Sequence, residues 1–232
     1  ISKTGDIWIL GRHRVMCGDS TKIDDVEKLM DGKKSDMVFT DPPYGIGFQY
    51  NEHQDMQGDD YLRFCGEWFN SIMALGSPYI VITTGWKYQK FWWNQDPKDC
   101  LYWICRDKRT GGGAFHFRKI EPIFIWGKPF KKYDFDFFEQ VTQKFKELEG
   151  KHTCPKPVSL IQAIIEKGCD YQGLVVDIFL GSGTTLIACE KTNRICYGME
   201  IDPKYCDVIV KRWEDFTGLK AELFQQNQQS HV

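Results

Sequence analysis

The residues Asp41-Pro42-Pro43-Tyr44 place a carboxylate and a phenol directly after a short apolar run, Met37-Val38-Phe39-Thr40. This run predicts a buried strand, which the prolines end because neither can donate to a sheet ladder. The carboxylate and the Pro42 carbonyl both accept hydrogen bonds, which suits an amino group with two hydrogens, and an aromatic ring beside them suits a flat base. A plain proline turn with a surface tyrosine is the alternative interpretation.

A second turn that could hold a ligand runs from Phe179 to Thr185 and contains Gly181 and Gly183. Glycines between a buried strand and a helix allow a ligand to approach the backbone closely. No lysine follows them, which excludes a phosphate-cradling P-loop. Three acidic residues lie at strand ends and would suit a cationic ligand: Asp19, Asp177 and Glu200. Glu200 ends the strand that follows the glycine turn, where its carboxylate could bind ribose hydroxyls. We therefore predict a nucleoside ligand without charged phosphates, and the alternative is a tight turn with solvated acids.

The elements that must position these residues alternate between strands and helices, which predicts an α/β fold with a mostly parallel sheet covered on both faces. Strands are expected at 6–10, 13–17, 37–40, 79–83, 101–105, 122–126, 174–178 and 195–200. Helices are expected at about 22–31, 60–75, 86–93, 157–167, 184–191 and 203–216. Ser20 or Thr21 could cap the first helix, and Gly32 would close it. Segment 45–60 is expected to be a loop, and 128–151 to be helical in part at most.

Composition sets broad limits on the 232-residue chain, which is 42% hydrophobic and 27% charged with a formal charge of −2. It indicates a globular protein without a transmembrane helix, and any nucleic-acid surface must be a local patch. The nine cysteines form no Cys-x-x-Cys pair, so we expect reduced thiols, no metal site and a cytoplasmic protein. The missing initiator Met suggests a piece of a longer chain.

Taken together, the motifs resemble those of the amino-methyltransferases that modify adenine in DNA. The shared features are the Asp41-Pro42-Pro43-Tyr44 motif and the glycine turn followed by a strand that ends in Glu200, and their order resembles the β class. The segments around His152 to Pro157, Gly18 to Ser20 and Glu121 to Ile123 also resemble family elements. Both ends of the chain look most like methylases of phages and mobile elements, which are often fused to a ParB-like domain.

The resemblance implies a Rossmann-like sheet of seven strands, mostly parallel with one antiparallel strand, and transfer of a methyl group from S-adenosylmethionine to N6 of adenine. It implies that Asp41, Pro42, Pro43 and Tyr44 act on a base flipped out of the duplex. The residues expected to bind the cofactor are Asp19, Lys156, Asp177, Phe179, Gly181, Gly183, Thr184, Thr185, Glu200 and Ile201. Lys156 is expected near Asp19. Ile178 and Leu180 depart from the usual turn, which we expect to survive because both are apolar.

We expect a single methyltransferase domain over 1–232, with a catalytic half at about 1–127 and a cofactor half at about 152–220. A short recognition segment at 128–151 would separate them, and 221–232 would be a polar tail. This segment is small for the family, so sequence selectivity should be short or relaxed. Segment 103–132 is basic and rich in aromatic residues, which predicts a DNA surface; its candidate residues are Arg106, Lys108, Arg109, Arg118, Lys119, Lys131 and Lys132.

Two other functions remain compatible with the sequence. An N4-cytosine methyltransferase would share the fold, although such enzymes usually carry Ser where this chain has Asp41. A nucleic-acid-binding module that has lost the chemistry is the other alternative, against which the complete set of motif residues argues. DNA is the expected partner in each case, with a fused or separate ParB-like or recognition domain as a further one. The sequence leaves open the recognition site, the choice between duplex, single strand and RNA, and the oligomeric state, including a homodimer.

Overall fold

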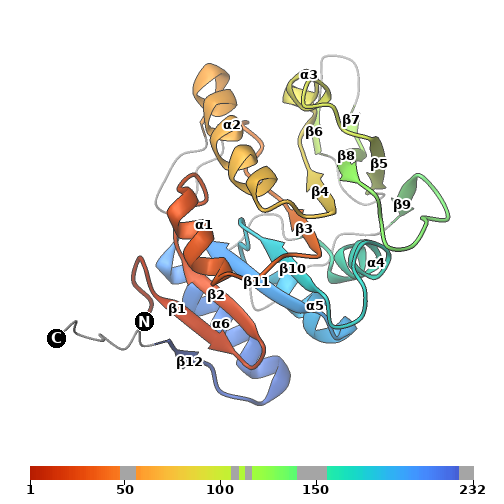
Figure 1. Cartoon of the computed structure of the whole chain (residues 1–232). Helices are drawn as coiled ribbons and strands as arrows, with labels where there is room; N and C mark the ends of the chain where they lie inside the picture. Colours follow the sequence, from red (N-terminus) through yellow and green to blue (C-terminus); the bar gives the residue numbers. More distant parts are fainter. Residues whose placement is uncertain (48–55, 106–109, 113–116, 140–155, 225–232) are drawn as a thin grey trace.

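The computed structural model describes residues 1–47, 56–105, 110–112, 117–139 and 156–224. A ten-stranded sheet runs through this part of the chain in the order β12-β1-β2-β11-β10-β3-β4-β8-β5-β9 (Figure 1). Its strands are β1 (Ile7–Leu10), β2 (His13–Cys17), β3 (Met37–Thr40), β4 (Tyr79–Thr83), β5 (Asp99–Ile104), β8 (Ile120–Gly127), β9 (Phe137–Glu139), β10 (Leu174–Asp177), β11 (Ile195–Glu200) and β12 (Glu222–Leu223). A separate pair joins β6 (Thr110–Gly112) to β7 (Phe117–Arg118).

The seven strands from β2 to β5 in this order confirm the expected sheet. Each neighbouring pair from β2 to β4 is parallel, whereas β8 runs antiparallel to both β4 and β5. All four residues of β3 and of β10 are buried, as expected of strands that are covered on both faces. The Asp41 motif therefore leaves the sheet between β10 and β4, with the glycine turn next to it.

In the described part of the chain, six α-helices flank the sheet: α1 (Ile23–Met30), α2 (Gly58–Ala74), α3 (Gln89–Trp93), α4 (Val158–Gly168), α5 (Thr184–Thr192) and α6 (Pro203–Thr217). A one-turn 3-10 helix, η1 (Trp86–Tyr88), precedes α3. One core cluster joins a sheet face to α4, α5 and α6, and the other joins the opposite face to α1, α2 and α3. The strands contribute to both clusters in alternation, with Phe39 in the first and Val38 in the second. The domain thus has three layers (Figure 1).

Helix α2 shows how the apolar pattern produces this packing. Its buried residues include Tyr61, Cys65, Trp68 and Ile72, which recur at intervals of three or four and so form one stripe. Trp68 packs against Trp92 of α3 with ring centroids 5.4 Å apart. Burying such large aromatic side chains anchors α2 and α3 on the same face of the sheet, beside the end of β3.

Several local predictions were wrong. The cap of α1 is Lys22 without a side-chain hydrogen bond, because the Thr21 hydroxyl donates instead to Asp19 Oδ1 at 2.7 Å. Within 128–151, Phe137–Glu139 forms β9 beside β5, and within the predicted polar tail Glu222–Leu223 forms β12 beside β1. Both extra strands are two or three residues long and lie at the sheet edges, where a short sequence carries little periodic signal.

Two expectations from composition concern described residues. The eight cysteines in the described part of the chain are all buried and form no disulfide there, which agrees with reduced thiols that behave as small apolar side chains. No helix among the described residues is long and apolar enough to cross a bilayer.

Candidate active site

The Asp41 carboxylate lies at the carboxyl end of β3 with 27% of its side chain exposed. Its Oδ1 atom accepts hydrogen bonds from the Tyr44 hydroxyl at 3.0 Å, the Lys156 ammonium at 2.9 Å and the Thr83 hydroxyl. Its Oδ2 atom accepts from Lys156 at 3.0 Å. Thr83 ends β4, the parallel neighbour of β3, so two adjacent strand ends fix the carboxylate in position.

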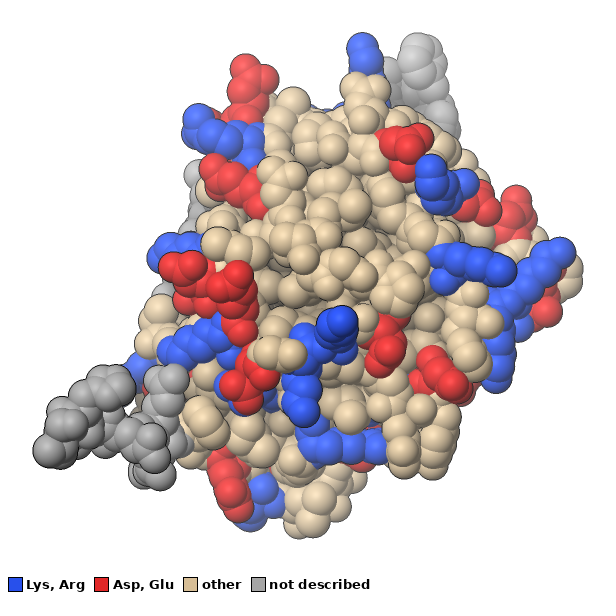
Figure 2. Space-filling model, in the orientation of Figure 1, with Lys and Arg blue, Asp and Glu red and all other residues tan. Residues whose placement is uncertain are grey.

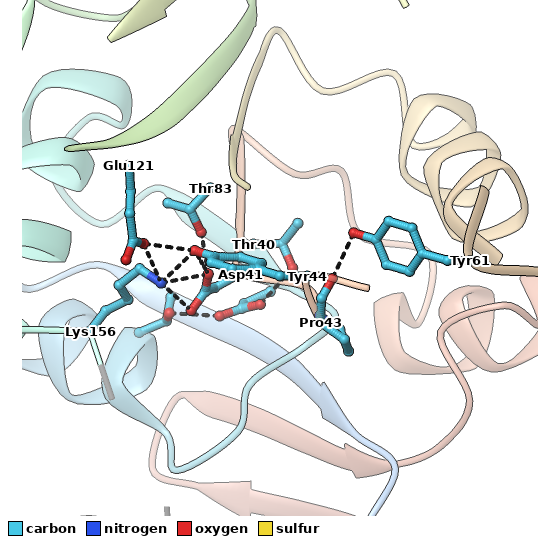
Figure 3. A network of polar contacts seen from close by, with 10 residues as sticks. Thr40, Asp41, Pro43, Tyr44, Tyr61, Thr83, Glu121 and Lys156 are labelled. Atoms are coloured by element: carbon cyan, nitrogen blue, oxygen red, sulfur yellow. Dashed lines mark hydrogen bonds and ion pairs between the residues drawn. The ribbon is translucent and has the colours of Figure 1, made fainter. Parts of the chain in front are cut away.

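Lys156 connects Asp41 to a second carboxylate, that of Glu121 in β8 (Figure 3). Its Nζ atom lies 3.3 Å from Glu121 Oε2 and 2.7 Å from the Tyr44 hydroxyl, and only 7% of its side chain is exposed. Burial opposes the charge on Lys156, but the Asp41 and Glu121 carboxylates together raise its pKa well above the usual value. The site therefore holds a permanently charged ammonium between two carboxylates.

Tyr44 points its hydroxyl into this cluster, where it lies 3.0 Å from Glu121 Oε2 as well as from Asp41 (Figure 3). Burial and the two neighbouring carboxylates raise the pKa of Tyr44 well above its usual value, so the phenol stays protonated. The ring packs on Gly85, where an added Cβ would lie 3.1 Å from three Tyr44 atoms. A larger residue at position 85 would therefore crowd the Tyr44 ring.

The proline turn itself is held from α2. Tyr61 donates a hydrogen bond of 2.8 Å to the Pro43 carbonyl (Figure 3). The Tyr61 ring packs with its centroid 4.4 Å from that of Tyr88. Gly45 adopts a φ of 66°, and a Cβ there would meet both rings at less than 3 Å. Pro42 is buried, and among the described residues no backbone amide donates to its carbonyl.

Glu200 lies at the carboxyl end of β11 and closes the glycine turn. Its Oε2 atom accepts from the Gly181 amide at 2.8 Å, and its Oε1 atom accepts from the Asp202 amide at 3.0 Å. Burial raises the pKa of Glu200 to about 7, even though these amides favour its charged form. Ile201 follows with 52% of its surface exposed, so a carboxylate and an apolar side chain lie side by side, as a ribose with an attached base would require.

Asp177 joins the glycine turn to the Asp41 strand. Its Oδ1 atom accepts from the Thr40 hydroxyl at 2.9 Å and the Phe179 amide at 3.0 Å, and its Oδ2 atom accepts from the Thr185 hydroxyl at 2.6 Å. Both Asp177 and Thr185 are 2% exposed. Three donors occupy this buried carboxylate, which makes it an internal support between β3 and α5.

The remaining predicted cofactor residues lie along the same edge of the sheet. The Gly18 amide donates to the Glu200 carbonyl at 3.0 Å, which brings the neighbouring Asp19, 29% exposed at its side chain, to the end of β11. Phe179 is partly buried and packs edge-on against Trp68 at 5.3 Å. Gly183 has a φ of 82° at the start of α5, and Thr184 is 6% exposed behind it.

Comparisons with known proteins decide the family. The family described as DNA methylase, named for N6 and N4 amino-methyltransferases, matches residues 87–211, just over half of the chain. This chain belongs to the DNA methylase family. The methylase is 25% identical over 244 residues to the type II methyltransferase M.HpaI of Haemophilus parainfluenzae, covering 90% of this chain and 77% of the relative.

Solved structures share the fold of the methylase. A putative DNA modification methylase from Thermus thermophilus, in complex with S-adenosyl-L-methionine, has a TM-score of 0.65 at 18% identity, covering 88% of this chain and 93% of that one. The PvuII DNA methyltransferase, described as cytosine-N4-specific, has a TM-score of 0.64 at 17% identity and covers 95% and 89%. The fold therefore leaves the target base of the methylase open.

The structure gives Lys156 partners that the sequence analysis did not name. Its ammonium contacts Asp41, Tyr44 and Glu121, and its expected place beside Asp19 and the cofactor stays a prediction. Sequence analysis also gave no role to Glu121, Thr83 or Tyr61. Ligands of open α/β sheets bind at the carboxyl ends of the strands, and this could have identified Thr83, because it ends the strand next to β3. Nothing in the local sequence around Lys156 indicates a partner 115 positions away along the chain.

The predicted DNA surface is only partly described. Lys119, Lys131 and Lys132 are exposed, whereas Arg106, Lys108, Arg109 and the Arg118 side chain lie outside the described residues. Trp103 and Trp126 were expected to interleave with these basic residues but are 1% and 6% exposed, because they belong to β5 and β8 and face the core. Basic and acidic side chains alternate over the face in Figure 2, with basic ones prominent along its right-hand edge.

The buried Asp177 carboxyl should make the stability of the methylase depend on pH. Burial raises its pKa to about 6 from the usual 3.8, so the folded state keeps a proton that the unfolded state releases. The free energy of unfolding should therefore fall as the pH rises from 4 to 7, by about 2–3 kcal/mol from this group. Urea titrations at several pH values should show a shallower fall for Asp177→Asn. Parallel curves for the two proteins would contradict this, and the exposed Asp215→Asn is the control.

Proposed function

We propose that this methylase transfers a methyl group from S-adenosylmethionine to N6 of adenine in DNA. The observation that carries the proposal is the partly exposed Asp41 carboxylate, fixed by Thr83, Tyr44 and Lys156 at the carboxyl end of β3. The Lys156 ammonium lies 2.9 Å from Asp41 Oδ1 and 3.0 Å from Oδ2, so a cation stands directly beside this carboxylate. The β-class order of the motifs is part of the same proposal.

The chemistry of the amino group explains why a carboxylate is needed. The N6 lone pair of adenine is delocalised into the ring, which makes the nitrogen a weak nucleophile. Hydrogen bonds from its two hydrogens to Asp41 and the Pro42 carbonyl favour a pyramidal nitrogen whose lone pair points at the methyl donor. This is catalysis by orientation and electrostatic stabilisation. The N–C bond to the methyl group would form as the methyl–sulfur bond breaks, with S-adenosylhomocysteine as the leaving group. The nitrogen then carries a positive charge, which the nearby carboxylate stabilises until a proton passes to water.

The glycine-turn half of the site fits S-adenosylmethionine, which supplies an electrophilic methyl group on a sulfonium. Glu200 has both oxygens placed by backbone amides and keeps lone pairs that ribose hydroxyls can use. The exposed Ile201 side chain offers an apolar surface to the cofactor adenine, and Asp19 lies near the same strand end. Gly181 and Gly183 keep the backbone open to the methionine portion. We assign Asp177, Thr184 and Thr185 to supporting this turn.

Product analysis tests the function directly. The purified chain is incubated with radiolabelled S-adenosylmethionine and unmethylated DNA, which is then digested to nucleosides and separated. We expect the label in N6-methyldeoxyadenosine. Label in N4-methyldeoxycytidine would replace the adenine assignment with that of a cytosine enzyme, and cofactor binding by calorimetry without any labelled nucleoside would identify a binding module. Single-stranded DNA and RNA substrates in parallel reactions establish which nucleic acid is used.

Replacing Glu200 tests the cofactor half of the site. Glu200→Ala should weaken S-adenosylmethionine binding by roughly 1.5–3 kcal/mol, because hydrogen bonds to a charged group are lost. Calorimetric titration measures the change, and Glu200→Gln keeps the size of the side chain while removing its charge. The control is Asp215→Ala, which removes a carboxylate that is 63% exposed on α6. Equal cofactor affinity in the wild type and Glu200→Ala would show that Glu200 only supports the turn.

A further inference from the structure

The cluster around Lys156 contains two charged groups, Lys156 and Glu121, in addition to the Asp41 carboxylate proposed to bind the base. Two carboxylates, Asp41 and Glu121, lie within 3.3 Å of one ammonium, and the Tyr44 hydroxyl is 3.0 Å from an oxygen of each (Figure 3). The elements that contribute them are far apart in sequence: β3, β8 and the residues before α4. Such an arrangement is costly to bury unless each charge is compensated.

The members of this cluster differ in their access to solvent. The Asp41 side chain is 27% exposed, whereas those of Lys156 and Glu121 are 7% and 6% exposed. An incoming amino group can therefore meet Asp41, while the other two lie behind it. Lys156 and Glu121 have to act on a substrate through Asp41.

Hydrogen-bond donors are shared unequally between the two oxygens of Asp41. Oδ1 accepts from Thr83, Tyr44 and Lys156, whereas within the described residues Oδ2 accepts from Lys156 alone. Oδ2 thus keeps a lone pair for a substrate N–H. The Tyr44 hydroxyl has a single proton and cannot donate to both carboxylates at once. Without the ammonium, the two acids would compete for this proton, and their repulsion would favour protonation of one of them.

We propose that Lys156 is a positioning residue that keeps Asp41 ionised and aimed at the target amino group, and that Glu121 keeps Lys156 in place. The inference rests on the proposed function, because it concerns how Asp41 performs its role. A protonated Asp41 would turn one oxygen into a donor and lose its charge-assisted bond to the amino group. The cluster supports catalysis by fixing the protonation state of the exposed member.

The test compares single-turnover methyl transfer by wild type, Lys156→Met and Lys156→Arg between pH 5 and pH 9. Lys156→Met should lower the rate at pH 7 roughly tenfold or more, as expected for loss of a preorganised charge. The acid limb of its pH profile should move upward by about one unit or more, because Asp41 then faces Glu121 without a cation. Affinity for S-adenosylmethionine should stay within about threefold, since no bond to a charged cofactor group is removed.

Two further variants separate charge from structure. Adding Glu121→Gln to Lys156→Met should return the acid limb toward its wild-type position, because the competing carboxylate is gone. Lys156→Arg keeps the charge, so its acid limb should stay in place even where its rate falls. Circular dichroism and thermal unfolding report whether each variant folds. If Lys156→Met does not fold, Lys156→Arg and Glu121→Gln alone still test the inference, since neither should raise the acid limb.

The outcomes distinguish this inference from the proposed function. A wild type that gives no N6-methyldeoxyadenosine contradicts the function itself. An active wild type with an unchanged acid limb in Lys156→Met, or a raised limb in Lys156→Arg, overturns the positioning role. Loss of cofactor binding in parallel with activity in Lys156→Met would overturn it too, and would return Lys156 to the cofactor site.

Discussion

Replacing Asp41 with alanine is expected to slow methyl transfer at least about 100-fold, the effect of removing one preorganised polar partner from a reacting centre. The Asp41 carboxylate is partly exposed at the end of β3, whereas the side chains of Lys156 and Glu121 are only 7% and 6% exposed. Affinity for S-adenosylmethionine should change little, because the Glu200 half of the site lies across β10 from Asp41. The variant should fold, since Glu121 remains to pair with Lys156.

Single-turnover assays with labelled cofactor measure this effect without interference from product release. Asp41→Asn adds a sharper comparison, because it keeps an acceptor oxygen and the side-chain shape but loses the charge. We expect the single-turnover rate of Asp41→Asn to lie between those of the wild type and Asp41→Ala. The control Asp60→Ala removes a carboxylate of α2 that is 70% exposed and pairs with Arg63. An Asp41→Ala enzyme with nearly normal turnover would exclude the assigned role.

Much of the fold could be predicted because the central strands have strong local signals. Runs such as 37–40 and 174–177 are apolar, short and bounded by prolines or glycines, and the structure buries every residue of both. The alternation of strands and helices then leaves few topologies. It also predicts that Asp41, Asp177 and Glu200 meet at one edge of the sheet, since parallel strands align their carboxyl ends. The structure confirms that adjacency through the bond from Thr40 to Asp177.

The position of Lys156 could not be predicted because it depends on tertiary packing. Its partners lie on β3 and β8, and only the order of strands in the folded sheet brings these together. The partner of Glu121 could not be predicted either, because the apolar sequence around this single acidic residue does not indicate which cation it contacts. The edge strands β9 and β12 were not predicted for another reason: two or three residues are too few to show an alternation of apolar and polar side chains.

Reversing the charge of Lys119, Lys131 and Lys132 together is expected to weaken DNA binding by on the order of 10²- to 10³-fold at 0.1 M salt. Each phosphate contact contributes a slope of about −0.9 to the dependence of log affinity on log salt, so three contacts contribute about −2.7. All three lysines are exposed; Lys119 precedes β8 at the end that pairs with Thr83, and Lys131 and Lys132 follow its other end. Lys131 also lies 5.6 Å from the ring of Phe130, which is 52% exposed and available for stacking on a base.

Fluorescence anisotropy with labelled duplexes at several salt concentrations measures both the affinity and the slope. The triple variant should lose affinity about equally for all sequences, because phosphate contacts position the protein without reading bases. Its S-adenosylmethionine affinity should be unchanged, since Glu200 and the glycine turn belong to other elements. The matched control reverses Lys33, Lys34 and Lys98, which are exposed elsewhere on the chain. Equal losses of DNA affinity in both triple variants would show that the effect comes from the net charge of the protein and not from these three positions. An unchanged affinity at low salt would exclude this surface and leave the DNA contacts to another part of the chain or to a partner domain.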